Sequence, residues 1–212
     1  MKNKYFCVES VIITLFFVSS CGIPYSLVTE KHVSAPENFV VDLPQGWRRH
    51  DASADPLIAE KELLERRHKL SWDIIRLTRD GLLLQQICIG RNAVSDELPN
   101  TKRKFAPEMT PIEAAEIIGD ELRSNSNLTN LEFIENTPMR VGGYPGFKLH
   151  YSYRTDDRLK IEELYYGALV GPWLYYLLYE APAQHYFKKD VSIFEATRAS
   201  FQIGKGQQEP KE

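Results

Sequence analysis

The sequence contains few of the residues with which proteins build cross-links and metal centres. Three cysteines and five histidines occur among 212 residues, and no two of them stand at metal-ligand spacing. The sequence also lacks a Gly-x-Ser-x-Gly nucleophile elbow, a phosphate-binding glycine loop and an internal repeat. We therefore expect no metal ion and no cofactor.

An excess of one charge and a long hydrophobic span are missing as well. The formal net charge is −3, and removal of the first twenty residues, with two lysines against one glutamate, brings it to −3 − 1 = −4. A mildly acidic chain has no general attraction to nucleic acid or to anionic lipid. The remaining composition, 43% hydrophobic and 26% charged residues, is typical of one globular domain.

A short basic start and an apolar run open the chain. Lys2 and Lys4 precede the apolar residues 11–18, and two serines and a cysteine come after them. This order is typical of a secretory signal peptide. The run is too short to cross about 30 Å of hydrocarbon, which takes about 20 helical residues. We interpret residues 1–20 as a removable signal.

The end of this segment, Val18-Ser19-Ser20-Cys21, resembles the lipobox of bacterial lipoproteins. In that family the cysteine thiol is diacylated and the chain is cut just before it. Two or more acyl chains give stable anchoring. The resemblance implies that Cys21 is lipidated and anchors the protein to a membrane. An ordinary secretory signal and an uncleaved anchor are the alternatives.

Two further residues qualify this interpretation. Gly22 is not the aspartate of the inner-membrane retention signal, so for a Gram-negative source the resemblance implies the outer membrane, with the domain facing the periplasm. Cys88, the remaining cysteine once Cys7 leaves with the signal, lies in an apolar stretch. A single cysteine forms no internal disulfide, and we expect a buried, inert thiol.

Turn residues divide the chain into strands. Asp80-Gly81, between two apolar runs, predicts a hairpin, because the tight turn needs positive φ. Alternation over residues 147–153, a long strand over 159–170 and an apolar strand over 173–179 come next, with turns at Asp156-Asp157 and Gly171-Pro172. The last strand is apolar on both faces, so helices must cover both sides of its sheet.

Two helices are predicted to supply this cover. Thr110-Pro111-Ile112-Glu113 is a capping box with proline at the first helical position, which starts a helix ending near residue 124. A second helix is expected over residues 183–200, and a weaker one over 55–64, where an extended alternative stays open. The predicted fold class is α+β, an α/β/α sandwich around a mostly antiparallel sheet.

Residues 37–203 resemble the PsbP-like family, named for the extrinsic protein of photosystem II and shared by the Ran-binding protein Mog and DcrB-type lipoproteins. The resemblance rests on the turn Leu43-Pro44-Gln45-Gly46-Trp47, a strand that ends in residues 141–146, the aromatic strands, Ala181-Pro182-Ala183 and Ala199-Ser200-Phe201. The resemblance implies the sandwich fold and a non-enzymatic accessory or binding role. Residues 51–105 depart from the better-known members, and no photosystem or Ran-binding motif is present.

The ends of the chain complete the domain scheme. Residues 21–36 begin with the cysteine and are mixed in composition and without period, and we interpret them as a tether. Residues 204–212 have no apolar residue and predict a disordered tail. The domain thus spans residues 37–203.

Candidate site residues are few. We expect structural or surface roles for His32, His50, His68, His150 and His185, of which His150 is the least ordinary because it lies between Lys148 and Ser152. The adjacent carboxylates of Asp156 and Asp157 fall in a turn, and those of Glu162 and Glu163 diverge to opposite faces of a strand.

Basic clusters and tyrosines leave two questions open. The clusters are residues 48–50, 66–69 and 102–104, either solvated faces balanced by acids or contacts for anionic headgroups. The tyrosines fall on adjacent strands, either as cross-strand core pairs or as the lining of a ligand groove. They are Tyr151, Tyr153, Tyr165, Tyr166, Tyr175, Tyr176 and Tyr179.

We predict a lipid-anchored envelope protein, not an enzyme, that binds an unidentified protein partner as an accessory factor. The alternatives are an envelope hydrolase with a site built from scattered residues and a purely structural lipoprotein. A cluster of histidine and carboxylates in a deep cleft would favour the hydrolase, and an exposed apolar or basic patch would favour the binding protein.

Overall fold

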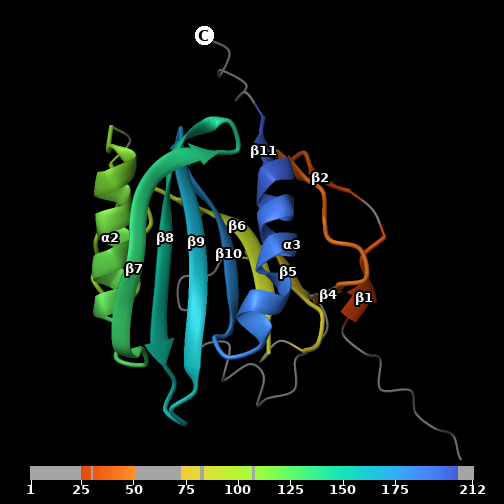
Figure 1. Ribbon diagram of the computed structural model, residues 1–212. Coiled ribbons are helices and arrows are strands. Elements are labelled where there is room, and N and C mark those ends of the chain that lie inside the picture. Colours follow the sequence, from red (N-terminus) through yellow and green to blue (C-terminus); the bar gives the residue numbers. More distant parts are fainter. Residues whose placement is uncertain (1–24, 30, 51–72, 82–83, 107, 205–212) are drawn as a thin grey trace, which may run out of the picture.

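The computed structural model describes residues 25–29, 31–50, 73–81, 84–106 and 108–204. Its layers are a helix, a large sheet and a second helix backed by a small sheet (Figure 1). The predicted signal, Cys21, the weak helix of residues 55–64, the basic cluster of residues 66–69 and residues 205–212 lie outside the described residues.

The large sheet has eight strands in the order β1-β4-β5-β6-β10-β9-β8-β7, and each neighbouring pair is antiparallel. The predicted antiparallel sheet is therefore confirmed. Its strands are β1 (Tyr25–Leu27), β4 (Arg48–His50), β5 (Asp73–Thr78), β6 (Gln86–Ala93), β7 (Thr129–Val141), β8 (Tyr144–Arg154), β9 (Lys160–Val170) and β10 (Trp173–Pro182).

A second, three-stranded sheet lies beside the carboxy-terminal helix. It joins β2 (His32–Ser34), β3 (Phe39–Val41) and β11 (Gln202–Ile203) in the order β11-β3-β2. The predicted tether of residues 21–36 needs a correction at this point, since β1 and β2 both fall inside it. Backbone pairing with β4 and β3 orders these two segments, although neither has a hydrophobic period.

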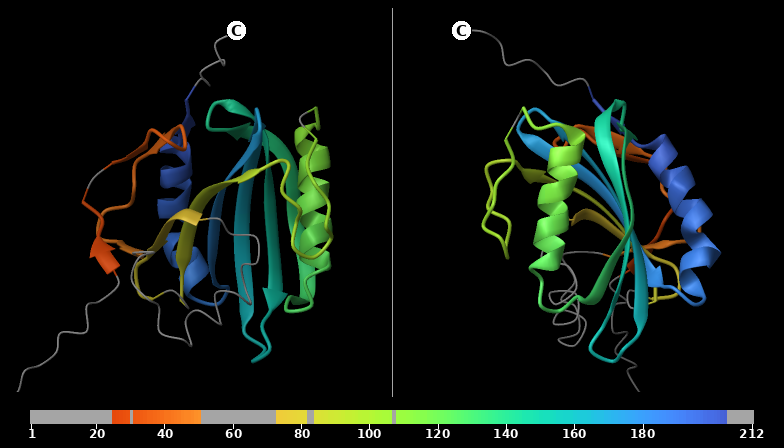
Figure 2. Two further views of the ribbon diagram at one scale, coloured as in Figure 1. Left: turned by 180° about the vertical axis from the view of Figure 1, so that it is seen from behind. Right: turned by 60° about the vertical axis from the view of Figure 1, so that its left-hand side comes forward.

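The helix α2 (Pro111–Arg123) covers one face of the large sheet, and α3 (Tyr186–Ser200) covers the other, as the turned view in Figure 2 shows. The predicted capping box starts α2. The Glu113 backbone N–H donates to Thr110 Oγ1 at 3.3 Å, and the Thr110 N–H donates to Glu113 Oε2 at 2.7 Å. The sequence predicts α3 three residues too early, because residues 183–185 form a turn.

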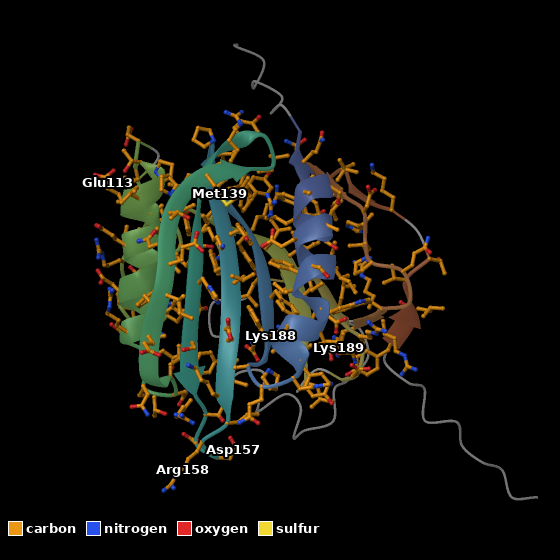
Figure 3. The ribbon with its side chains drawn as sticks, in the orientation of Figure 1. Glu113, Met139, Asp157, Arg158, Lys188 and Lys189 are labelled. Carbon is orange, nitrogen blue, oxygen red and sulfur yellow. The ribbon has the colours of Figure 1, made fainter. Side chains whose placement is uncertain are left out.

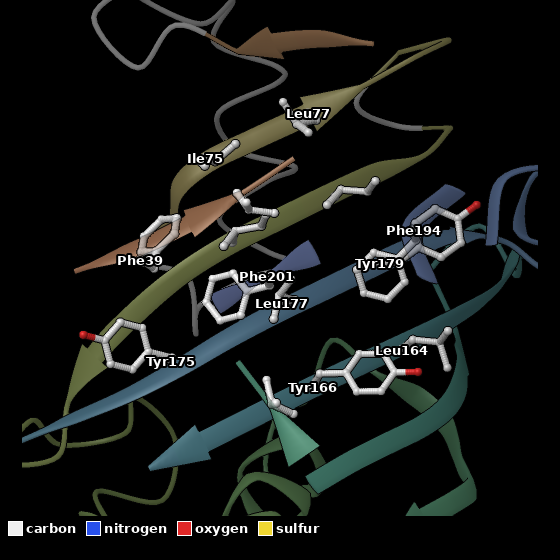
Figure 4. Packing of buried hydrophobic residues seen from close by; sticks show 14 of the residues in the cluster. Phe39, Ile75, Leu77, Leu164, Tyr166, Tyr175, Leu177, Tyr179, Phe194 and Phe201 are labelled. Carbon is white, nitrogen blue, oxygen red and sulfur yellow. The ribbon is translucent and has the colours of Figure 1, made fainter. Parts of the chain in front are cut away.

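Two hydrophobic cores occupy the two faces, and β10 contributes to both. Tyr175, Leu177 and Tyr179 belong to the core under α3 (Figure 4), whereas Leu174, Tyr176 and Leu178 belong to the core under α2. Burying each large side chain of this kind contributes about 1.5–3 kcal/mol. The apolar strand is therefore covered on both sides, as predicted.

The turn between β7 and β8 depends on two glycines. Gly142 and Gly143 have φ of +60° and +93°, a region that residues with side chains rarely adopt. A Cβ on Gly142 would stand 2.7 Å from Ile203, so this turn also needs glycine for its contact with β11. The strand that the sequence predicts to end in residues 141–146 ends at Val141, and Tyr144 already belongs to β8.

Candidate functional site

The tyrosines predicted on adjacent strands are core residues. All seven are at most 2% exposed and are divided between the two cores. The hydroxyls of Tyr151 and Tyr166 donate to Glu163 and Glu195, and that of Tyr175 donates to the Glu37 carbonyl at 3.0 Å. The structure therefore assigns them to packing rather than to the lining of an open groove.

The tyrosine hydroxyls accompany carboxylates whose burial the sequence did not indicate. Glu163 and Glu180 are each 2% exposed and lie opposite one another on β9 and β10. Tyr153 donates to Glu180 at 3.2 Å. Burial and the nearby Glu163 carboxylate raise the pKa of Tyr151 well above its usual value, so this phenol stays protonated and donates.

The basic cluster of residues 48–50 forms β4, where alternate side chains point to opposite faces. Arg49 points inward. It lies 3.3 Å from His32 Nδ1 and donates to the Ile74 carbonyl at 3.3 Å. Because a guanidinium can only donate, His32 Nδ1 accepts and the ring proton sits on Nε2. Burial and the Arg49 charge lower the pKa of His32. Arg48 remains exposed.

The cluster of residues 102–104 is balanced by acids. Arg103 binds Asp120 at 2.6 Å, and Lys104 lies 3.7 Å from Glu97. Exposed pairs of this kind contribute little to stability. For this cluster the geometry favours the solvated, neutralised face over a headgroup contact.

A strip of polar side chains crosses β7, β8 and β9 on the face of the large sheet that carries α3. Figure 3 shows this face with its side chains, and α3 covers only a part of it. We call it the polar strip. Its members are half-buried or exposed, except for Ser152, which is 1% exposed. They are Glu132, Glu135, Lys148, His150, Ser152, Lys160 and Glu162.

Two hydrogen-bonded pairs organise the polar strip. His150 Nε2 lies 2.7 Å from Glu162 Oε1, and the imidazole stacks on Phe187 of α3 with ring centroids 5.6 Å apart. Lys148 Nζ lies 2.6 Å from Glu135 Oε2, and this hydrogen bond lowers the pKa of Glu135. The sequence indicated His150 as the least ordinary histidine, but its partner twelve residues away is set by strand register.

Ser152 completes a serine, histidine and glutamate on one sheet face. It lies directly opposite Glu162, and among the described residues its Oγ has no hydrogen-bond partner. A serine hydrolase needs the hydroxyl bonded to the imidazole, which activates it as general base. Here the imidazole Nε2 is bonded to Glu162 instead, so the trio is not arranged as a catalytic triad.

Two open pockets lie at opposite ends of this face. One, of about 290 Å³, is bordered by β7 and β8 near Ser152 and Lys160. The other, of about 490 Å³, lies between the β7–β8 turn and the end of α3, with Arg140, Arg198 and Tyr144 on its walls.

The remaining expectations concern chemistry and membranes. Cys88 is buried, with Sγ 3.9 Å from Gln86 Oε1, as predicted. In the part of the chain that the structure describes, no group of three or more metal-ligand side chains occurs. Over the same residues, no helix has the length and apolarity that crossing a bilayer requires.

The side chains of Glu162 and Glu163 diverge as expected, toward His150 and Tyr151.

Comparisons with known proteins support the fold. No family model matches the sequence, and no curated protein matches it significantly. The solution structure of cyanobacterial PsbP (CyanoP) from Synechocystis sp. PCC 6803 is 13% identical, covers 88% of this chain and 98% of its own, and superposes with a TM-score of 0.53. The chain has a PsbP-like fold, as the sequence resemblance implied.

Weaker structural similarities extend to other proteins. A mutant of the protein Mog1 covers 82% of this chain and 95% of its own at 7% identity and a TM-score of 0.48. LpqN of Mycobacterium tuberculosis, described as involved in cell envelope biogenesis, covers 87% of each chain at 12% identity and a TM-score of 0.41. Similarity at these levels assigns no activity to this chain.

Proposed function

We propose that this protein is a lipid-anchored component of the cell envelope, an accessory factor that binds another protein without catalysing a reaction. The observation that supports the anchor is the lipobox-like sequence ending at Cys21, which stands four residues before the first strand of the domain. A globular domain that begins shortly after the cysteine is the expected product of cleavage and acylation at that residue.

The anchor is tested by changing its cysteine. Cys21→Ser should abolish incorporation of labelled palmitate and release the protein from the membrane fraction, while circular dichroism shows an unchanged fold. Cys7→Ser is the matched control, because Cys7 lies in the segment that cleavage removes. A Cys21→Ser protein that stays with the membranes contradicts the proposal.

The binding role is supported by the polar strip, which places charged, half-buried side chains beside two open pockets. A photo-crosslinker at Thr137, exposed on β7 opposite Lys148, should capture a specific envelope protein from intact membranes. The control position is Glu116, exposed on α2. A partner captured equally from both positions, or from neither, contradicts binding at the strip.

A hydrolase is the second candidate, and the observation in its favour is the common face of Ser152, His150 and Glu162. This function requires the imidazole to exchange Glu162 for the serine hydroxyl. Hydrolysis of a chromogenic ester that disappears in both Ser152→Ala and His150→Gln would support it. Activity that persists in both variants would exclude this site.

A further inference from the structure

We infer that the β1–β4 edge of the large sheet is the side of the domain that lies against the membrane, with Leu27 and Arg48 at the lipid headgroups. This inference rests on the proposed acylation of Cys21 and adds an orientation to it. The occupant of the surface is the bilayer that holds the anchor, with anionic phosphate groups facing Arg48.

The short reach of the chain limits how far the domain can stand from its anchor. Tyr25 opens β1, so only residues 22–24 separate it from Cys21. Even fully extended, four residue steps span at most about 14 Å. That distance is shorter than the span of the sheet, since its eight strands lie roughly 5 Å apart. The anchor therefore holds the β1 edge near the lipid, whereas the β7 edge lies beyond the reach of the tether.

Strand β1 is itself fixed to the domain. Its three residues pair with β4, and the next residue, Val28, is 7% exposed and belongs to the core under α3. The Val28 N–H donates to the Trp47 carbonyl at 2.8 Å, and the Tyr25 ring meets His50 edge-on at 5.5 Å. Because β1 is held at these points, the domain cannot turn freely about a long tether.

The side chains of this edge suit a membrane surface. Three large hydrophobic side chains are exposed among the described residues, and Leu27, at 62%, is the most exposed of them. Arg48 lies directly opposite Leu27 in the strand register and is exposed as well. An apolar side chain beside a cation suits the boundary of acyl chains and anionic headgroups.

The neighbouring cationic side chains Arg49 and Lys31 contact other groups of the protein, so we expect Arg48 to be the one that contacts the headgroups. Arg49 points inward to His32 and the Ile74 carbonyl, and Lys31 lies 3.3 Å from Asp42. Figure 1 shows β1 and β7 at opposite sides of the large sheet. On β7, Ile134 is 53% exposed and offers a control position of similar character at the far edge.

The test uses the acylated full-length protein in vesicles of phosphatidylcholine and phosphatidylglycerol that carry a nitroxide on some headgroups. A fluorophore is attached to Leu27→Cys, to Arg48→Cys and to the control Ile134→Cys, all in one Cys88→Ser background. We expect the labels at positions 27 and 48 to lose most of their emission to the nitroxide and the label at 134 to keep most of it. Two labelled positions keep the test valid if one variant fails to fold.

The possible results test the orientation of the domain and its lipid anchor separately. Protein that does not float with the vesicles shows that the proposed acylation has failed, and Cys21→Ser provides the reference for that result. Protein that floats but is quenched equally at all positions, or more strongly at 134, overturns the orientation while leaving the anchor intact.

Discussion

The helices α2 and α3 cover opposite faces of one sheet, but different forces determine where they form. The sequence of α2 contains enough local signals to place this helix. They are a reciprocal capping box, proline at the first position and a buried face that includes Ala115, Ile118 and Leu122. The first residue before α3, His185, makes no side-chain cap, and few of the helix's residues are fully buried. Contacts with distant strands therefore hold α3 in place.

Each helix buries one carboxylate that ties down a loop. On α2, Glu121 accepts four hydrogen bonds from the backbone and side chains of Asn100 and Thr101, at 2.6–2.8 Å. On α3, Asp190 accepts from Arg79 at 2.8 Å and from Gln85. Local signals thus suffice to place one helix and not the other, whereas buried polar contacts join both of them to the rest of the domain.

The largest expected effect is the loss of a tertiary contact of α3. Phe194 is fully buried and packs on the rings of Tyr166 and Tyr179, with centroids 5.7 and 5.4 Å away (Figure 4). Phe194→Ala should lower the free energy of unfolding by about 3–5 kcal/mol. Urea denaturation measures it, with Ile112→Ala on the exposed side of α2 as control. A loss no larger than that of the control would show that α3 is not held by its core contacts.

The next effect concerns the loop held by α2. Glu121→Gln keeps the shape of the side chain but replaces one of its two acceptor oxygens by an amide group, so half-buried donors of Asn100 or Thr101 lose their acceptor, which should cost about 1–3 kcal/mol. The exposed Glu116→Gln is the matched control on the same helix. Urea curves that coincide for the two variants would contradict the role of the buried carboxylate.

A smaller effect tests the N-terminal capping signal of α2. Thr110→Ala removes the N-cap of α2 and should lower the stability by about 1 kcal/mol. His185→Ala, at the corresponding position of α3, should change it less, because no side-chain hydrogen bond is lost. Equal losses of stability for the two variants in urea denaturation would contradict a stabilising side-chain cap at α2 alone.

The smallest effect depends on pH and lies outside both helices. Burial and the Arg49 charge lower the pKa of His32 in the folded protein. Below about pH 6.5, His32 therefore binds a proton more readily in the unfolded chain than in the folded protein. Stability is therefore complete above this pH and declines as the pH falls through it. Thermal melts should show that His32→Gln loses less stability between pH 7 and pH 5 than the parent protein. An identical decline in both proteins would contradict this assignment.

Turn chemistry and capping allowed much of the fold to be predicted. The strands β5 and β6 pair as the predicted hairpin, but the connection runs from Arg79 to Gln85 and is not the expected tight turn, since of Asp80 and Gly81 only Gly81 has a positive φ. The turns after Arg154 and Val170 separate β8, β9 and β10. The strand β6 begins only at Gln86, later than the apolar run that starts at residue 82. Backbone bonds from Leu84 and Gln85 to the Gly81 carbonyl extend the connection between β5 and β6.

Other elements gave no local signal. The strands β1, β2 and β11 have two or three residues, too few to show a period. The edge strand β7 is mostly exposed and polar, so its full extent depends on pairing with β8. The pairing of His150 with Glu162 and the burial of Glu180 depend on strand register, which a single sequence does not specify.

The attachment of β1 has a mechanical consequence. If the anchor is lipid at Cys21, any tension between the membrane and a bound partner enters the domain through three residue pairs of β1 with β4 and through the buried side chain of Val28. This short edge strand would be the first part of the sheet to carry the load. Pulling experiments on the anchored chain should therefore detach β1 before the long strands β7 to β10 separate.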